Sequence, residues 1–301
     1  MALTTILVGC DLSPGSDVAL ERAIAIAAPH GATVVLVHAQ AEDAPPAEID
    51  HVMQEQLGEV SALVRARDAR ELADRMAHVE ARGVAAQLIS RNGPPEEVLA
   101  QAAAERQAEL IAIGSQGHTG IARMLLGSVA SSTIRHATCD VLVCRGPVAA
   151  ARFGRPLVAT DFSPVSAKVL EHAALLAEPG APFDLVHAWQ LPTGSWGATL
   201  LGQARFPWST VRDAVLASAR SLADKLVTDH QGLGHPLHVA LEQGAPAQVI
   251  TQAAERGSND LIAVGAHGRR GVRRLLLGSV AESTIRHSPC SVLVVHGDPK
   301  P

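Results

Sequence analysis

Aromatic residues and cysteines are scarce in this sequence. It has 301 residues without a single tyrosine, and phenylalanine and tryptophan together make up 2% of the chain. Hydrophobic residues still account for 47%, so any core must be built mainly from alanine, leucine, valine and isoleucine. The four cysteines lack the spacing of a disulfide framework, which favours reduced thiols in a cytoplasmic protein.

Long hydrophobic runs and clusters of a single charge sign are also missing. No apolar run reaches the length of a membrane span, so the sequence predicts no membrane association. The formal net charge is −5 and the basic residues form no long stripe, so we expect no nucleic-acid partner. The apolar content that remains is ample for two cores of ordinary size.

An internal repeat is the most informative feature that the sequence does contain. Segment 126–136 (LGSVASSTIRH) matches segment 277–287 (LGSVAESTIRH) at all but one position. The beginnings of the two copies also correspond, with ILVGCDLSP in one and LVATDFSP in the other. A repeat of this length is far beyond the unit of a solenoid, so each copy should bury its own core. The predicted domains are residues 1–146 and 152–297.

Each copy carries a glycine motif suited to holding phosphates, G-x2-G-x9-G-S. Its residues are Gly114, Gly117, Gly127 and Ser128 in copy one, and Gly265, Gly268, Gly278 and Ser279 in copy two. Both motifs follow an apolar run (LIAIG or LIAVG) and open an apolar-periodic helix. Glycines let a polyphosphate approach bare backbone, and a helix N-terminus supplies N–H donors. We expect the serine to cap that helix. The motif differs from a Walker motif, because no lysine follows the loop glycine, and from the dinucleotide fingerprint in its spacing.

Alternating strand and helix patterns predict an α/β fold for each copy. In copy one, buried strands are expected at 4–9, 33–39, 84–90, 110–114 and 141–144, and helices at 16–28, about 48–82, about 95–105 and 128–136. Pro29 and Gly31 should end the first helix. Such alternation indicates a mostly parallel sheet with right-handed crossovers. Ligands of open α/β sheets bind beyond the strand carboxyl ends where the strand order reverses, and Asp11 and Gly114 end two such strands.

These motifs resemble those of the universal stress protein family, and the tandem arrangement resembles its two-domain members. The resemblance rests on the glycine motif, the aspartate that closes the first strand, and the RHxxCxVLV tail of each copy, and it covers nearly the whole chain. It implies two flavodoxin-like (Rossmann-like) domains. Each is a five-stranded, mostly parallel sheet of order 3-2-1-4-5 with helices on both faces. It also implies ATP, with or without Mg²⁺, in those members that keep the glycine motif.

The resemblance assigns a role to particular residues of this chain. Asp11 and Asp161 stand where the family places an acidic group near the adenosine. The backbone of His38 and Ala39, and of His187 and Ala188, stands where the main chain meets adenine. The remaining candidate binding residues are Gly114, Ser115, Gly117, His118, Gly127, Ser128 and Val129 in copy one, and Gly265, Gly268, Arg269, Gly278, Ser279 and Val280 in copy two. No catalytic residue and no metal ligand is predicted.

Structural roles compete with several of these assignments. The two aspartates could simply shape a turn or cap a helix, and His38 and His187 could be core histidines. Arg269 could clamp a phosphate or belong to a solvated helix face. His136 and Cys139 suggest a metal site, but each copy has only one such pair and a zinc site needs about four ligands. A histidine that interacts with the C-terminal end of its helix is the better interpretation. Segment 189–208 with its tryptophans is a loop over its own core, or else a lid or partner surface.

The function that best fits is an ATP-binding, nucleotide-dependent regulator or sensor of the stress response, a role taken from the resemblance alone. One alternative is a weak magnesium-dependent nucleotide hydrolase or phosphotransferase; no positioned base is evident, so we expect weak ATPase activity at most. A second alternative is an interaction module with vestigial pockets. The resemblance further implies that the last strands, 141–144 and 292–295, are edges that could pair the two domains as a pseudo-dimer, or pair two chains as a homodimer.

Overall fold

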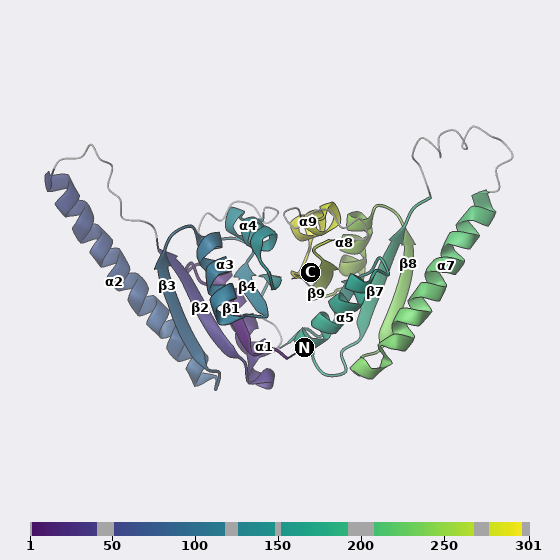
Figure 1. Ribbon diagram of the computed structural model, residues 1–301, viewed down its shortest axis with the longest axis horizontal. Coiled ribbons are helices and arrows are strands. Elements are labelled where there is room, and N and C mark those ends of the chain that lie inside the picture. Colours follow the sequence, from purple (N-terminus) through teal and green to yellow (C-terminus); the bar gives the residue numbers. More distant parts are fainter. Residues whose placement is uncertain are drawn as a thin grey trace. The chain divides into compact units, whose positions relative to one another are not determined.

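The computed structural model describes residues 2–40, 51–117, 126–147, 152–191, 208–267 and 277–296. The chain divides into two compact units, Met1–Ala151 and Arg152–Pro301, each an alternation of strands and helices (Figure 1). Within the described ranges, no helix combines the length and the apolar character needed to cross a bilayer.

Unit one follows the strand–helix order that the sequence predicts. Its elements are β1 (Thr5–Gly9), α1 (Pro14–His30), β2 (Thr33–Gln40), α2 (His51–Ala81), β3 (Ala86–Asn92), α3 (Pro95–Arg106), β4 (Leu110–Gly114), α4 (Ser128–His136) and β5 (Asp140–Cys144). All pairings within this sheet are parallel, and they give the order β3-β2-β1-β4-β5.

Unit two repeats this arrangement. Its elements are β6 (Pro156–Ala159), α5 (Pro164–Leu176), β7 (Phe183–Trp189), α7 (Trp208–Asp229), the 3-10 turn η1 (Gln231–Leu233), β8 (Leu237–Gln243), α8 (Pro246–Gly257), β9 (Leu261–Gly265), α9 (Ser279–His287) and β10 (Ser291–Val295). Parallel pairings give the order β8-β7-β6-β9-β10. The predicted α/β class with a mostly parallel sheet in each of two copies is confirmed.

Helices cover both faces of the sheet in unit one. Helix α2 is joined to α1 by the ion pair between Arg75 and Asp17 (2.8 Å) and by contact of His78 with Glu21, whereas α3 packs against α4. The chain moves from β1 toward β3 through α1 and α2 and then returns toward β5 through α3 and α4. Right-handed crossovers therefore place these two pairs on opposite faces. The central strands lie between them, and Ile6, Leu7 and Val8 of β1 are fully buried.

The first helix corrects one detail of the prediction. Pro29 does not stop α1, because the helix continues to His30. It ends at Gly31, as predicted, and the left-handed backbone of this glycine (φ 62°) lets its N–H reach the carbonyls of Ala27 and Ala28. The missing N–H of a proline removes only one helical hydrogen bond there, so the last turn tolerates it.

Candidate functional site

The strand order of each unit creates a crevice at one edge of its sheet. In unit one, β1 pairs with β2 on one side and with β4 on the other. The connections that leave β1 and β4 run in opposite directions across the sheet, so their carboxyl ends form a switch point. Strands β6 and β9 make the same arrangement in unit two. The structure has a cavity at each switch point.

Site one, the cavity of unit one, has a volume of about 310 Å³. It brings together residues from the ends of β1, β2 and β4 and from the start of α4. The candidate residues in its wall are Asp11, Ala39, Gly114, Ser115, Gly117, Gly127, Ser128 and Val129.

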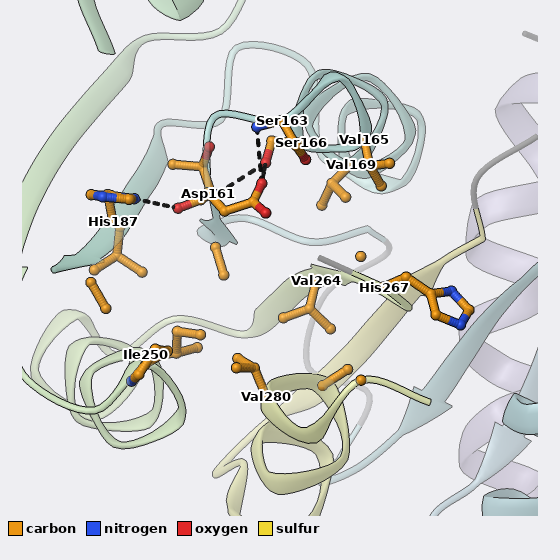
Figure 2. A pocket seen from close by; sticks show the side chains of 18 of the residues that line it. Asp161, Ser163, Val165, Ser166, Val169, His187, Ile250, Val264, His267 and Val280 are labelled. Atoms are coloured by element: carbon orange, nitrogen blue, oxygen red, sulfur yellow. Dashed lines mark hydrogen bonds between the residues drawn. The ribbon is translucent and has the colours of Figure 1, made fainter. Parts of the chain in front are cut away.

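Site two, the cavity at the switch point of unit two, is larger than site one, at about 540 Å³. Figure 2 shows its side chains converging from β6, β7, β9 and the helices α5, α8 and α9. The candidate residues in its wall are Asp161, His187, Ala188, Gly265, Gly278, Ser279 and Val280.

Three candidate residues, His118, Gly268 and Arg269, lie outside the described residues, as do Trp196 and Phe206. Their assignments therefore stay predictions. Trp189 is placed at the end of β7 and is buried, with 8% of its surface exposed.

Each site contains an aspartate at the end of its first strand, and this carboxylate shapes the turn that follows. In site one, Oδ1 of Asp11 accepts hydrogen bonds from the backbone N–H (3.0 Å) and the hydroxyl of Ser13. In site two, Oδ1 of Asp161 accepts from the N–H of Ser163 (2.9 Å) and from the hydroxyl of Ser166 (2.8 Å), as Figure 2 shows. The turn-forming role is therefore present in both sites, and each carboxylate also lines the cavity.

The helices that follow the glycine motif begin without a side-chain cap. The N-cap residue of α4 is Gly127 and that of α9 is Gly278, so the prediction that Ser128 caps its helix is wrong. Ser128 is instead the first residue inside α4. A glycine cap offers no oxygen to the first-turn N–H groups. These groups, at the positive end of the helix dipole, border the cavity in each unit.

The two histidines have different positions although their hydrogen bonds match. Nδ1 of His38 lies 2.8 Å from the carbonyl oxygen of Cys10, and Nδ1 of His187 lies 2.8 Å from that of Thr160. A carbonyl only accepts, so Nδ1 carries the hydrogen in both rings. His38 is buried, with 7% of its surface exposed, and is not part of the cavity wall, whereas His187 is. The His187 ring also stacks on Phe162, with centroids 4.4 Å apart.

An apolar wall faces the glycine motif in both sites, and sequence reasoning missed it. Pro95 and Leu99 of α3 provide it in site one, and Pro246 and Ile250 of α8 in site two. The proline that opens each of these helices was a visible signal of the helix start. The position of the helix over the cavity follows only from the crossover that returns the chain to the switch point.

No charged side chain other than the aspartate is found among the described wall residues of site one. Cys10 lies beside Asp11, and burial raises the pKa of its thiol, so it is a neutral group at physiological pH. The site therefore offers backbone N–H groups, one carboxylate and an apolar wall. This combination suits a ligand with a flat apolar part and an anionic part.

His136 and His287 have a structural role at the ends of α4 and α9. Their Nδ1 atoms lie 2.9 Å from the carbonyl oxygens of Ser132 and Ser283, one turn earlier in each helix. Within the described ranges, no group of three histidine, cysteine or acidic side chains is arranged to hold a metal ion. All four cysteines are free thiols.

The fold of the chain is similar to that of solved structures over nearly its full length. A universal stress protein from Archaeoglobus fulgidus DSM 4304 superposes with a TM-score of 0.64 at 24% identity, covering 98% of this chain and 96% of that chain. The structure of a putative universal stress protein from Pseudomonas aeruginosa UCBPP-PA14 gives a TM-score of 0.68 at 18% identity, covering 99% and 94%. At these identities the similarity establishes the fold: two flavodoxin-like α/β domains in tandem.

Sequence comparison identifies the family. The model of the universal stress protein family matches residues 3–145 and again 153–296, and the chain belongs to that family. It is 28% identical over 302 residues to a universal stress protein of Mycolicibacterium smegmatis, covering 96% of each chain. It is also 32% identical over 140 residues to universal stress protein MJ0531 of Methanocaldococcus jannaschii, covering 46% of this chain and 79% of that protein.

Proposed function

We propose that this universal stress protein binds ATP at the carboxyl edge of its sheets and acts as a nucleotide-dependent regulator or sensor of the stress response. One observation carries the proposal. In each unit, an uncapped helix N-terminus, a glycine-lined strand end and an aspartate meet at a single cavity. The stress-response role follows from membership of the family.

Different parts of the cavity suit different parts of ATP. The N–H groups at the start of α4 and α9 would hold phosphate oxygens, because their N-cap residue is a glycine without a capping side chain and they lie at the positive end of the helix dipole. The apolar wall and the backbone near Ala39 or Ala188 would hold the adenine. Asp11 or Asp161 would lie near the ribose.

The glycine at position 127 supports a close ligand approach. Its φ of −60° is open to any residue, so its backbone does not require glycine. Among the described residues, the atom nearest to a β-carbon built there is the carbonyl oxygen of Ser115, at 3.6 Å. Packing within the described residues therefore leaves room for a side chain, and the space beside Gly127 is available to a phosphate.

A weak magnesium-dependent hydrolase is the second candidate. Each cavity has one carboxylate among its described wall residues, and Mg²⁺ is commonly held by one or two carboxylates together with substrate phosphates. Phosphate release from ATP, measured with and without magnesium and compared with an Asp11→Asn/Asp161→Asn double variant, distinguishes this candidate. Turnover that depends on magnesium and on the aspartates supports the hydrolase; binding without turnover supports the regulator.

The proposal is tested on the purified full-length chain. Heating releases any bound small molecule, and chromatography of the supernatant identifies it. We expect an adenine nucleotide, either carried through purification or taken up from added ATP after desalting. A third candidate, an interaction module with vestigial pockets, is supported if no nucleotide is recovered from folded protein even after incubation with ATP.

Assembly and location belong to the same proposal. In each unit the last strand, β5 or β10, pairs within its own unit with one neighbour, β4 or β9. We propose that these edge strands pair the two domains as a pseudo-dimer or pair two chains as a homodimer. We also propose that the protein is located in the cytoplasm. Sedimentation velocity measures the number of chains per particle, with and without ATP.

A further inference from the structure

The two copies differ at the position that faces the glycine loop from the first helix. Ser13-Pro14 is followed by Gly15 in α1, and Ser163-Pro164 is followed by Val165 in α5. Val165 is part of the wall of site two (Figure 2), whereas Gly15 has no side chain to contribute to site one.

In unit one, the loop after β4 lies directly on α1. A β-carbon built on Gly15 would overlap the carbonyl oxygen of Gln116. A β-carbon on Gly114 would lie 2.6 Å from the carbonyl carbon of Gly15. Real β-carbons do not approach backbone this closely, so the contact depends on glycine on both sides.

The same loop also lies over the aspartate of site one. A β-carbon on Gly117 would lie 2.6 Å from Oδ2 of Asp11. The main chain of residues 115–117 therefore occupies space beside the carboxylate, and these residues form part of the wall of the smaller cavity.

In unit two, a side chain separates the loop from the helix. The atom of α5 nearest to a β-carbon built on Gly265 is a side-chain atom, Cγ1 of Val165, at 3.0 Å. In unit one, the atom nearest to a β-carbon built on Gly114 is the backbone carbonyl carbon of Gly15, at 2.6 Å. The larger volume of site two, about 540 Å³ against about 310 Å³, agrees with this separation.

We propose that the two sites are inequivalent and that the residue at position 15 or 165 sets the difference: site two, held open by Val165, binds adenine nucleotide at least tenfold more tightly than site one. This inference rests on the proposed function. A nucleotide that enters site one must displace the loop from Gly15 and Asp11, and the free energy of that displacement lowers the apparent affinity. Site two requires no such displacement, because the Val165 side chain stands where Gly15 makes a backbone contact in site one.

The tryptophans allow the two sites to be measured separately. All three, Trp189, Trp196 and Trp208, belong to unit two, and Trp189 directly follows Ala188 in the wall of site two. Tryptophan fluorescence therefore reports binding in unit two, whereas calorimetry measures both sites. For the wild-type chain titrated with ATP, we expect calorimetry to show one tight site whose affinity equals that from fluorescence.

Three variants test the role of the β-carbon. Val165→Gly should weaken the fluorescence-detected affinity about tenfold, because it removes the separating side chain. Val165→Ala keeps a β-carbon and is the matched control, with an affinity within about threefold of wild type. Gly15→Ala should displace the loop of unit one and raise the affinity of site one toward that of site two, which calorimetry would record as a second tight binding event. If the Gly15→Ala variant does not fold, as judged by circular dichroism, the two Val165 variants decide the test.

The outcomes separate this inference from the proposed function. Two sites of equal affinity in the wild-type chain, or folded Gly15 and Val165 variants that bind as wild type does, would overturn the inference while leaving ATP binding intact. Absence of any ATP binding to the folded wild-type chain would overturn the proposed function itself.

Discussion

Replacing Gly278 with aspartate should stabilise unit two while weakening its nucleotide binding. Gly278 is the N-cap of α9, in an extended conformation (φ −61°, ψ 140°) that suits aspartate. An aspartate cap exceeds glycine by a few tenths of a kcal/mol, and its charge adds about 0.3–1 kcal/mol by interaction with the helix dipole. A β-carbon there would lie 3.1 Å from the carbonyl oxygen of Ala266, a close contact that offsets part of this gain. We therefore expect a net gain of about 0.5 kcal/mol.

The same carboxylate would oppose an anionic ligand at the helix N-terminus. Two unit charges about 4 Å apart interact by about 4 kcal/mol at an effective dielectric constant of about 20. One third of that repulsion is enough for a tenfold loss of affinity. Binding is measured by tryptophan fluorescence and stability by thermal unfolding, where 1 kcal/mol corresponds to about 2–4 °C in a domain of this size.

Gly278→Asn is the matched control for charge. Asparagine caps a helix about as well as aspartate but brings no negative charge, so its affinity for ATP should exceed that of the aspartate variant. If Gly278→Asp folds and binds ATP as tightly as wild type, the N-terminus of α9 does not hold the phosphates.

Three further predictions concern packing and ionisation. Gly114→Ala should lower the free energy of unfolding by about 1–3 kcal/mol in urea titrations, because its β-carbon would lie 2.6 Å from the backbone of Gly15. Gly127→Ala should change the free energy of unfolding by less than about 0.5 kcal/mol, because the nearest described atom is 3.6 Å from its β-carbon. Equal effects of the two variants would contradict these contacts. Ser166→Ala removes the hydroxyl that donates to Asp161 at 2.8 Å, and the urea midpoint should fall by an amount equivalent to about 1 kcal/mol; an unchanged midpoint would show that this bond adds nothing. Burial raises the pKa of the Cys144 thiol to about 12 from 9.0, so the folded state favours the protonated form. The difference in stability between wild type and Cys144→Ala should therefore be constant below pH 9, and above it the advantage of wild type should fall by about 1.4 kcal/mol per pH unit. A difference in stability that does not change with pH would argue against the burial of this thiol.

Local patterns predicted the elements that form the cavity edge. The bounds of β4 and α4 coincide with the predicted 110–114 and 128–136, because a short apolar run that ends in glycine and a Gly-Ser helix start are both local signals. The aspartate at the end of each first strand was likewise visible, and the structure adds its turn-forming hydrogen bonds.

What the sequence could not reveal depends on contacts between distant segments. The apolar wall from α3 and α8 is set by the crossover geometry. In the sequence, the difference between Gly15 and Val165 is one of many between the two copies. Its importance follows only from the contact of residues 114–117 with the backbone of α1. The helix cap was misassigned because serine is a common cap and only the backbone conformation shows that Gly127 holds that position.

Equilibrium dialysis of the folded wild-type chain against labelled ATP tests the central claim most directly. The account predicts saturable binding that excess unlabelled ATP displaces and that disappears when urea unfolds the protein. Folded protein that retains no labelled ATP at millimolar concentration would contradict it.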